Sequence, residues 1–183
     1  SWMLVLLNNV VETTGKENLF EVWPNLEVYF HGGVSFEPYI RQYQALLPNP
    51  DFKYYEIYNA SEGFFAIQDD LDSDGMLLLT KNQIYYEFIP YEKYKSNTYE
   101  VLNLSQVRVG KEYVLLISST AGLIRYVQGD LVTFVSVQPF RVKVTGRIQE
   151  YINAFGEDLS FSQANSALIH TCKECKVEVI NFS

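Results

Sequence analysis

The sequence predicts an α/β fold, with a mixed sheet and flanking helices. Three observations support this prediction: apolar residues at helical spacing near the start, short segments rich in β-branched and aromatic residues through the middle, and a second helical pattern near the end. With 183 residues and 48% hydrophobic residues, the chain is long enough to bury a core.

Helices are predicted in three places. The first covers Trp2–Val11, and Gly15 supplies a stop signal after it. The second begins with Pro38 in its first turn and ends before Pro48. The third covers Ser162–Cys175.

Strands are predicted between and after these helices. They cover Leu26–Phe30, Lys53–Ile57, Phe64–Ile67, Met76–Thr80, Ile84–Ile89, Tyr113–Ser118, Leu131–Val137, Arg141–Val144 and Val177–Ile180. The short link Lys81-Asn82-Gln83 indicates a hairpin between the two strands that flank it.

Composition excludes several classes of partner. A net charge of -8 argues against a nucleic acid or an anionic membrane as the main partner, because both attract clustered Lys and Arg. No apolar stretch approaches the ~20 residues of a membrane helix. The two cysteines, Cys172 and Cys175, are a weak metal signal, and two reduced thiols are the plainer alternative. A low cysteine count favours a cytoplasmic protein.

Asp130 is a candidate for binding a ribose. A carboxylate accepts hydrogen bonds from two hydroxyls at once, and Gly129 can supply the turn that fixes it. The alternative is that Gly129-Asp130 forms an ordinary hairpin turn between two strands.

Glu62 is a candidate Mg²⁺ ligand, because Mg²⁺ prefers one or two carboxylates together with phosphate oxygens. Tyr58, four residues earlier, can place its ring against an adenine. The alternative is an exposed glutamate after a buried tyrosine.

Two further glycine segments stand out. Gly146-Arg147 follows a strand, where a hinge between domains can lie, and Arg147 can reach an anionic group. His31-Gly32-Gly33 can expose backbone N–H groups to a pocket, with His31 as a structural, hydrogen-bonded residue. No Gly-Lys-Ser/Thr follows, so this segment is not a P-loop.

Together these segments resemble a known family. Tyr58-Asn-Ala-Ser-Glu62, Arg125-Tyr-Val-Gln-Gly-Asp130 and Gly146-Arg147 are similar to the second and third nucleotide motifs and the crossover of the auxin-responsive Gretchen Hagen family. These proteins are acyl acid amido synthetases of the adenylate-forming superfamily. Longer strings, including His31-Gly-Gly-Val-Ser-Phe-Glu-Pro-Tyr39, look most like its bacterial branch.

The resemblance implies an ATP- and Mg²⁺-dependent ligase that activates a carboxylic acid as an acyl-adenylate and transfers it to an amine such as an amino acid. By position, the nucleotide and metal residues would be Tyr58 near the adenine, Glu62 on Mg²⁺ and phosphate, Asp130 on the ribose, Arg147 at the hinge, and their neighbours Ser61 and Tyr126. Glu62 would also be catalytic. Gly32, Gly33 and Val34 would line the acyl pocket.

The resemblance also divides the chain. Residues 1–146 would be the last part of a large N-terminal adenylation domain, and residues 147–183 the hinge and the start of a small C-terminal domain. The phosphate-binding loop would precede Ser1, so we expect this fragment alone to be inactive. Self-association through apolar surface near Trp2 is a further alternative. The alternative function is a noncatalytic module whose aromatic-rich sheet binds a small carboxylate or another chain.

Overall fold

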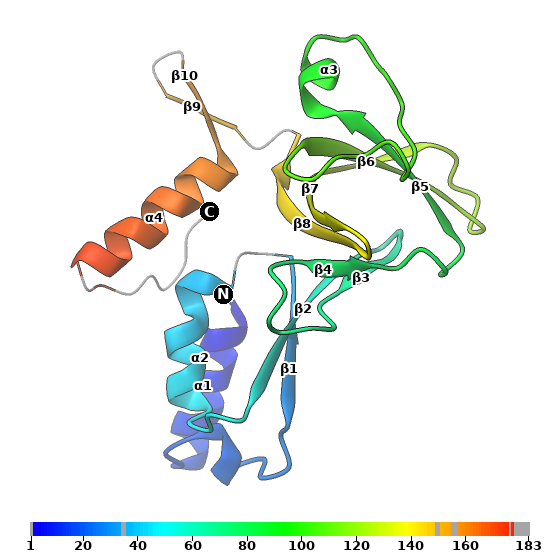
Figure 1. Cartoon of the computed structure of the whole chain (residues 1–183). Coiled ribbons are helices and arrows are strands. Elements are labelled where there is room, and N and C mark those ends of the chain that lie inside the picture. The colour runs from blue at the N-terminus through cyan, green and yellow to red at the C-terminus, as the bar shows by residue number, and fades with distance from the viewer. Residues whose placement is uncertain (1, 34–35, 149–150, 155–156, 176, 178–183) are drawn as a thin grey trace. The chain divides into compact units, whose positions relative to one another are not determined.

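A computed structural model of the chain describes residues 2–33, 36–148, 151–154, 157–175 and 177. Its contacts divide the chain into two compact units: unit 1 comprises residues 1–55 and 165–183, and unit 2 comprises residues 56–164. The α/β fold class is confirmed, with helices and a large sheet (Figure 1). This division by contacts differs from the predicted domain boundary at 146/147, which stays a prediction.

Unit 1 packs its first two helices around a small aromatic core. Its elements are α1 (Trp2–Thr14), the 3-10 turn η1 (Leu19–Glu21), β1 (Val28–His31), the 3-10 turn η2 (Glu37–Tyr39) and α2 (Ile40–Leu46). The predicted first two helices are confirmed, and Pro38 lies in the 3-10 turn that leads into α2. Leu4, Leu19 and Tyr43 are among the most deeply buried residues of this core.

The predicted third helix is also confirmed, as α4 (Phe161–Cys175). Cys172 and Cys175 are free thiols on this helix. The predicted strand Val177–Ile180 falls, apart from Val177, outside the described residues.

Unit 2 is built around a long sheet. The strands are β2 (Lys53–Ala60, which begins in unit 1), β3 (Gly63–Ile67), β4 (Met76–Leu78), β5 (Ile84–Pro90), β6 (Glu112–Ser119), β7 (Tyr126–Val137) and β8 (Phe140–Arg147). Their order is β2-β3-β4-β8-β7-β6-β5, with β1 beside β2, and each strand pair with a described register is antiparallel. The short helix α3 (Tyr91–Lys95) and a hairpin of β9 (Tyr151–Ala154) and β10 (Glu157–Ser160) complete the unit.

The predicted hairpin between Met76–Thr80 and Ile84–Ile89 is wrong. β4 instead pairs with β3 and β8, whereas β5 pairs with β6. Met76 and Leu78 are 1% and 4% exposed, so their burial against distant strands outweighs pairing across a short link. The link also lacks the Asn-Gly pair that favours tight hairpins.

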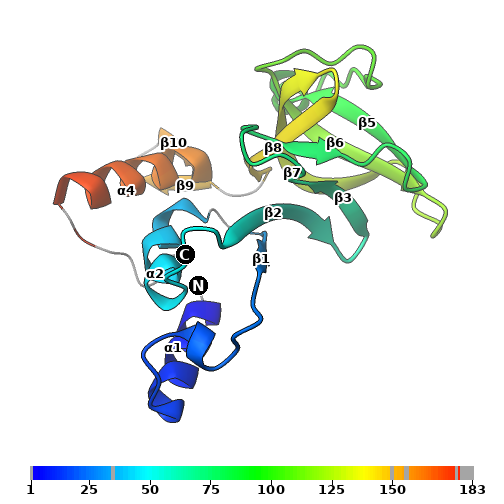
Figure 2. The same cartoon turned by 60° about the horizontal axis from the view of Figure 1, so that its bottom comes forward.

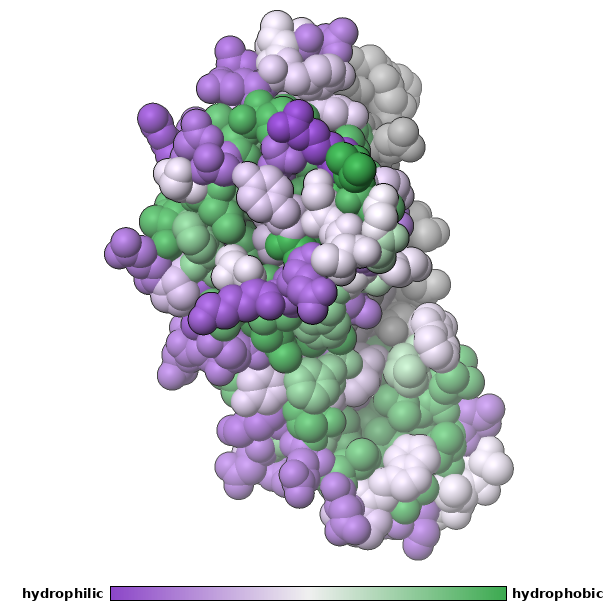
Figure 3. Space-filling model, turned by 90° about the vertical axis from the view of Figure 1, so that its right-hand side faces the viewer, coloured by the Kyte–Doolittle hydropathy of each residue, from purple (hydrophilic) through white to green (hydrophobic). Residues whose placement is uncertain are grey.

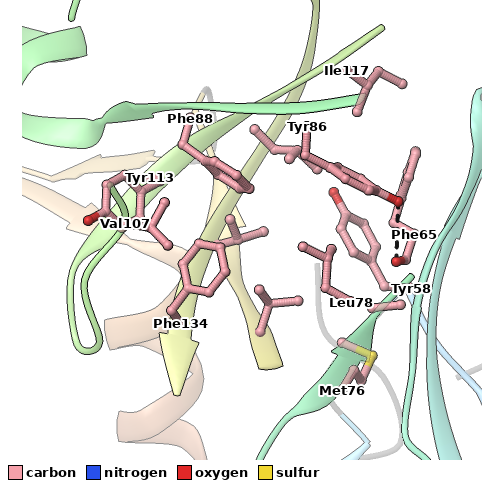
Figure 4. Close-up of a cluster of buried hydrophobic side chains, with 14 residues drawn as sticks. Tyr58, Phe65, Met76, Leu78, Tyr86, Phe88, Val107, Tyr113, Ile117 and Phe134 are labelled. Carbon is pink, nitrogen blue, oxygen red and sulfur yellow. Dashed lines mark hydrogen bonds between the residues drawn. The ribbon is translucent and has the colours of Figure 1, made fainter. Parts of the chain in front are cut away.

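The sheet of unit 2 curls around its own core. Tyr86 on β5 donates its hydroxyl to the carbonyl of Phe65 on β3 at 3.4 Å, the contact dashed in Figure 4. These strands are five places apart in the sheet order, and a flat sheet would separate them by roughly 20 Å or more. The strands therefore wrap around the buried cluster. Figure 2 shows their curved course. This curl lets side chains from β2 reach β7.

The surface mixes polar and apolar side chains, as the face in Figure 3 illustrates. On α1, Trp2, Val5 and Leu6 are 69%, 60% and 49% exposed. Within the described part of the chain, none of the helices has the length and apolar character to cross a membrane.

Candidate functional site

A bulge in β7 sets the geometry of the candidate site. Val114 of β6 pairs with Leu131 of β7, whereas Leu116 pairs with Val127, so β7 carries extra residues at this point. Gly129 lies in the bulge with a φ of +87°, which L side chains rarely adopt. Such bulges re-aim the side chains beside them. Asp130 thus lies inside a strand, and not in the hairpin turn that was the alternative.

Asp130 is buried and held by two donors from different strands. Its Oδ2 accepts a hydrogen bond from the Tyr58 hydroxyl at 2.6 Å, and its Oδ1 accepts one from Arg147 Nε at 2.9 Å. Asp130 is only 6% exposed. A buried carboxylate needs such donors, because burial without partners costs several kcal/mol or more. The structure therefore brings together three of the predicted site residues.

Tyr58 lies inside the cluster of unit 2, 7% exposed, with its ring 4.9 Å from that of Phe65 between centroids. Burial, and then the negative charge of Asp130, raise the pKa of Tyr58 far above its ordinary value. The phenol therefore stays protonated and donates at any physiological pH. Its predicted place beside an adenine stays a prediction.

Glu62 is held by a second pair of donors. It lies in the turn between β2 and β3, where the Tyr126 hydroxyl donates to Oε1 at 3.3 Å. The Gln128 amide donates to Oε2 at 3.4 Å. Both donors come from the start of β7, two residues apart, so the carboxylates of Glu62 and Asp130 are tied to the same segment. Ser61 is exposed in the same turn.

The Glu62 carboxylate can bind a metal ion whose remaining ligands are not protein side chains. Among the described residues, no three His, Cys, Asp or Glu side chains gather into a metal-binding group. A single carboxylate is what Mg²⁺ needs from the protein when phosphate oxygens and water fill its other positions. Glu62 therefore suits a metal–nucleotide complex, and not a metal site formed by the protein alone.

The predicted acyl-pocket residues belong to unit 1. Gly32 and Gly33 are exposed just after β1, and Gly33 has a φ of +81°. Val34 lies outside the described residues. The preceding His31 stacks on Phe36 with 4.0 Å between ring centroids. Burial lowers the pKa of His31 to about 4, so its imidazole is neutral.

Two residues that the sequence analysis missed support the site. Gln128 was overlooked, although Tyr126, Gln128 and Asp130 follow the two-residue period of a strand, which would have placed them together. Glu87, only 7% exposed, accepts two hydrogen bonds from Arg125, the residue before Tyr126. This ion pair anchors the start of β7.

Two family domains match parts of this chain. The GH3 family N-terminal domain matches residues 2–52, and the GH3 family central domain matches residues 77–147. The second match contains Tyr126, Asp130 and Arg147.

The chain carries GH3 family domains.

Two plant proteins are among the relatives in sequence. An indole-3-acetic acid-amido synthetase, GH3.3, from Arabidopsis thaliana is 30% identical over 138 residues, which are 69% of this chain and 22% of the relative. A jasmonoyl–L-amino acid synthetase, GH3.5, from Oryza sativa subsp. japonica is 33% identical over 61% of this chain and 22% of the relative. The chain thus spans about a fifth of each relative. The bacterial branch stays a prediction.

Solved structures show the same fold. The GH3.15 acyl acid amido synthetase in complex with 2,4-DB matches 90% of this chain and 29% of its own, with a TM-score of 0.70 and 15% identity. A 2-hydroxyisobutyryl-CoA ligase in an open conformation matches 92% of this chain and 39% of its own, with a TM-score of 0.57 and 18% identity. The fold is therefore that of GH3 synthetases and adenylate-forming ligases.

Proposed function

We propose that the chain is part of a cytoplasmic, ATP- and Mg²⁺-dependent acyl acid amido synthetase. The enzyme activates a carboxylic acid as an acyl-adenylate and transfers the acyl group to an amine such as an amino acid. The observation that carries this proposal is the buried Asp130 carboxylate, held by Tyr58 and Arg147 on the strand that also supplies the partners of Glu62. The names of two relatives, an indole-3-acetic acid-amido synthetase and a jasmonoyl–L-amino acid synthetase, support this reaction class.

Five of the described residues have a role in this proposal. Asp130 accepts hydrogen bonds from the ribose hydroxyls of ATP, and Arg147 neutralises its charge at the end of β8. Glu62 would hold Mg²⁺ together with the phosphates. The metal, when bound, offsets the negative charge that develops on the phosphate oxygens. Tyr126 and Gln128 orient Glu62 toward it.

The proposed reaction has two steps with ATP as a substrate. A carboxylate oxygen of the acyl acid attacks the α-phosphorus, which forms an acyl–phosphate bond while pyrophosphate leaves. The amine then attacks the acyl carbon, AMP leaves, and the amine nitrogen loses a proton. Fixed donors and charges, more than covalent chemistry by the protein, stabilise the first step.

The test is ATP–pyrophosphate exchange, by the full-length protein, that depends on an added carboxylic acid. We expect exchange by the wild type, and a loss of about a hundredfold or more for Asp130→Asn and for Glu62→Gln. Isothermal titration with ATP and Mg²⁺ distinguishes the alternative, a noncatalytic binding module, because such a module would not bind the nucleotide. Absence of both ATP binding and exchange would refute the proposal.

The proposal also includes an expectation for the isolated 183-residue chain. The relatives are about five times longer than the region they share with it. We expect the isolated chain to show no acid-dependent exchange, whereas exchange by the isolated chain would overturn this part of the proposal.

A further inference from the structure

Within the described residues, Asp130 retains two acceptor positions after its side-chain contacts with Tyr58 and Arg147 are counted. A carboxylate has two oxygens, each able to accept about two hydrogen bonds. Tyr58 occupies one position on Oδ2, and Arg147 occupies one on Oδ1. One position on each oxygen is left for a ligand. Two donors side by side, such as the 2′ and 3′ hydroxyls of a ribose, match that pair.

The two protein donors to Asp130 differ in how firmly they are fixed. The Arg147 side chain is 57% exposed at the end of β8, whereas Tyr58 is 7% exposed in the core. The Tyr58 ring packs on Phe65 and is enclosed by the cluster, so its hydroxyl has little freedom to move. The hydroxyl of Tyr58 is thus the donor that fixes the orientation of the Asp130 carboxylate.

We propose that Tyr58 is a positioning residue that selects ribonucleotides: its hydroxyl holds Oδ2 of Asp130 so that both free acceptor positions face the vicinal ribose hydroxyls. This inference rests on the proposed function, since it assumes that Asp130 binds the ribose. It assigns a role to the hydroxyl of Tyr58 that is separate from the predicted contact of its ring with adenine. Without that hydroxyl, the Asp130 carboxylate is free to rotate about its side-chain bonds, and its two free acceptor positions no longer face both ribose hydroxyls.

The experiment compares Tyr58→Phe with the wild type in the full-length protein, by isothermal titration with ATP and with 2′,3′-dideoxy-ATP. We expect the ratio of the affinity for ATP to that for the dideoxy nucleotide to fall about tenfold in Tyr58→Phe. A tenfold change is the size expected for the loss of one hydrogen bond to a charged group. Affinity for the dideoxy nucleotide stays unchanged. A purely structural role of Tyr58 would instead alter both affinities equally, or neither.

Tyr86→Phe is the matched control. Tyr86 lies in the same cluster, 2% exposed, but its hydroxyl donates to the backbone carbonyls of Phe65 and Leu79 and not to Asp130. We expect its preference for ATP to equal that of the wild type. If Tyr58→Phe does not fold, Tyr58→Met, whose apolar side chain is smaller and also lacks a hydroxyl, is measured instead, and we expect the same fall in the preference for ATP over the dideoxy nucleotide.

The outcomes separate this inference from the proposed function. If Asp130→Asn abolishes the preference for ATP while Tyr58→Phe and Tyr58→Met retain it, Tyr58 does not position the carboxylate and the inference is refuted. If the wild type binds ATP and its dideoxy analogue equally, Asp130 does not bind the ribose, and the ribose assignment fails together with the inference.

Discussion

The side-chain amide of Gln128 donates to the carboxylate of Glu62 at 3.4 Å and so links the bulged part of β7 to the turn after β2. Gln128 is 9% exposed, and within the described structure its Oε1 is buried without a hydrogen-bond partner. A buried amide with an unpaired oxygen weakens the fold. We infer that Gln128 contributes more to the orientation of Glu62 than to stability.

The first prediction concerns Gln128→Met, which keeps the side-chain volume and removes the amide. Glu62 loses one of its two donors, so the Mg²⁺ concentration for half-maximal exchange should rise about tenfold, as for other residues that orient metal ligands. The melting temperature should stay close to that of the wild type. Gln44→Met, on the exposed face of α2, is the control. An unchanged Mg²⁺ dependence in Gln128→Met would show that Tyr126 alone orients Glu62.

The second prediction concerns Gly129→Ala in the bulge. An added Cβ would meet no atom within 4 Å, so the cost comes from the φ of +87° alone, about 1–2 kcal/mol. Relief of that strain turns the peptide before Asp130, and nucleotide affinity should fall at least fivefold by titration.

Gly110→Ala is the control for Gly129→Ala. Gly110 has a φ of +75° and equally open surroundings, but its N–H bonds the carbonyl of Phe134. We expect a similar loss of stability in chemical denaturation and unchanged nucleotide affinity. Equal losses of affinity in both variants would show that Gly129 acts only through stability.

The helices could be predicted from local signals, whereas strand pairing could not. Gly15 and Pro38 act within a few residues, so they mark the first two helices correctly. The partner of β4 is decided by Val142 of β8, which pairs with Met76 across a long stretch of chain. A link of three residues predicts local pairing, and here long-range burial outweighs it.

The site residues with local sequence signals could be predicted, whereas their long-range partners could not. Asp130 and Glu62 stand out because carboxylates next to small residues are chemically suggestive in sequence. The partner of Glu87 is Arg125, 38 residues later, and nothing local links them. From sequence, the Tyr58 ring is predicted to contact a base. The hydrogen bond from its hydroxyl to Asp130 depends on the curl of the sheet and has no local signal in the sequence.

The third prediction concerns Arg125, whose Nη2 and Nε bind Glu87 at 2.8 and 3.0 Å. Arg125→Met leaves the buried Glu87 carboxylate without its cation, so the melting temperature should fall by several degrees. Adding Glu87→Leu removes the buried charge and should restore most of the loss. The exposed Arg108→Met is the control. If the double variant is no more stable than Arg125→Met, the buried charge is not the cause.

The fourth prediction follows from the neutral imidazole of His31. Its pKa in the folded chain is about 4, against an ordinary 6.5. Below pH 6.5 the unfolded chain takes up a proton that the folded chain does not, so stability falls with pH until about pH 4, where both forms are protonated. Because the ring is only half-buried, the loss at pH 5 should be on the order of 1 kcal/mol.

Urea denaturation at pH 7 and pH 5 measures this loss. His31→Phe keeps a ring that can stack on Phe36 but cannot take up a proton, so its loss of stability between the two pH values should be smaller than that of the wild type. His170→Gln, which replaces an exposed histidine on α4, should behave as the wild type does. A wild-type loss that persists in full in His31→Phe would mean that groups other than His31 cause it.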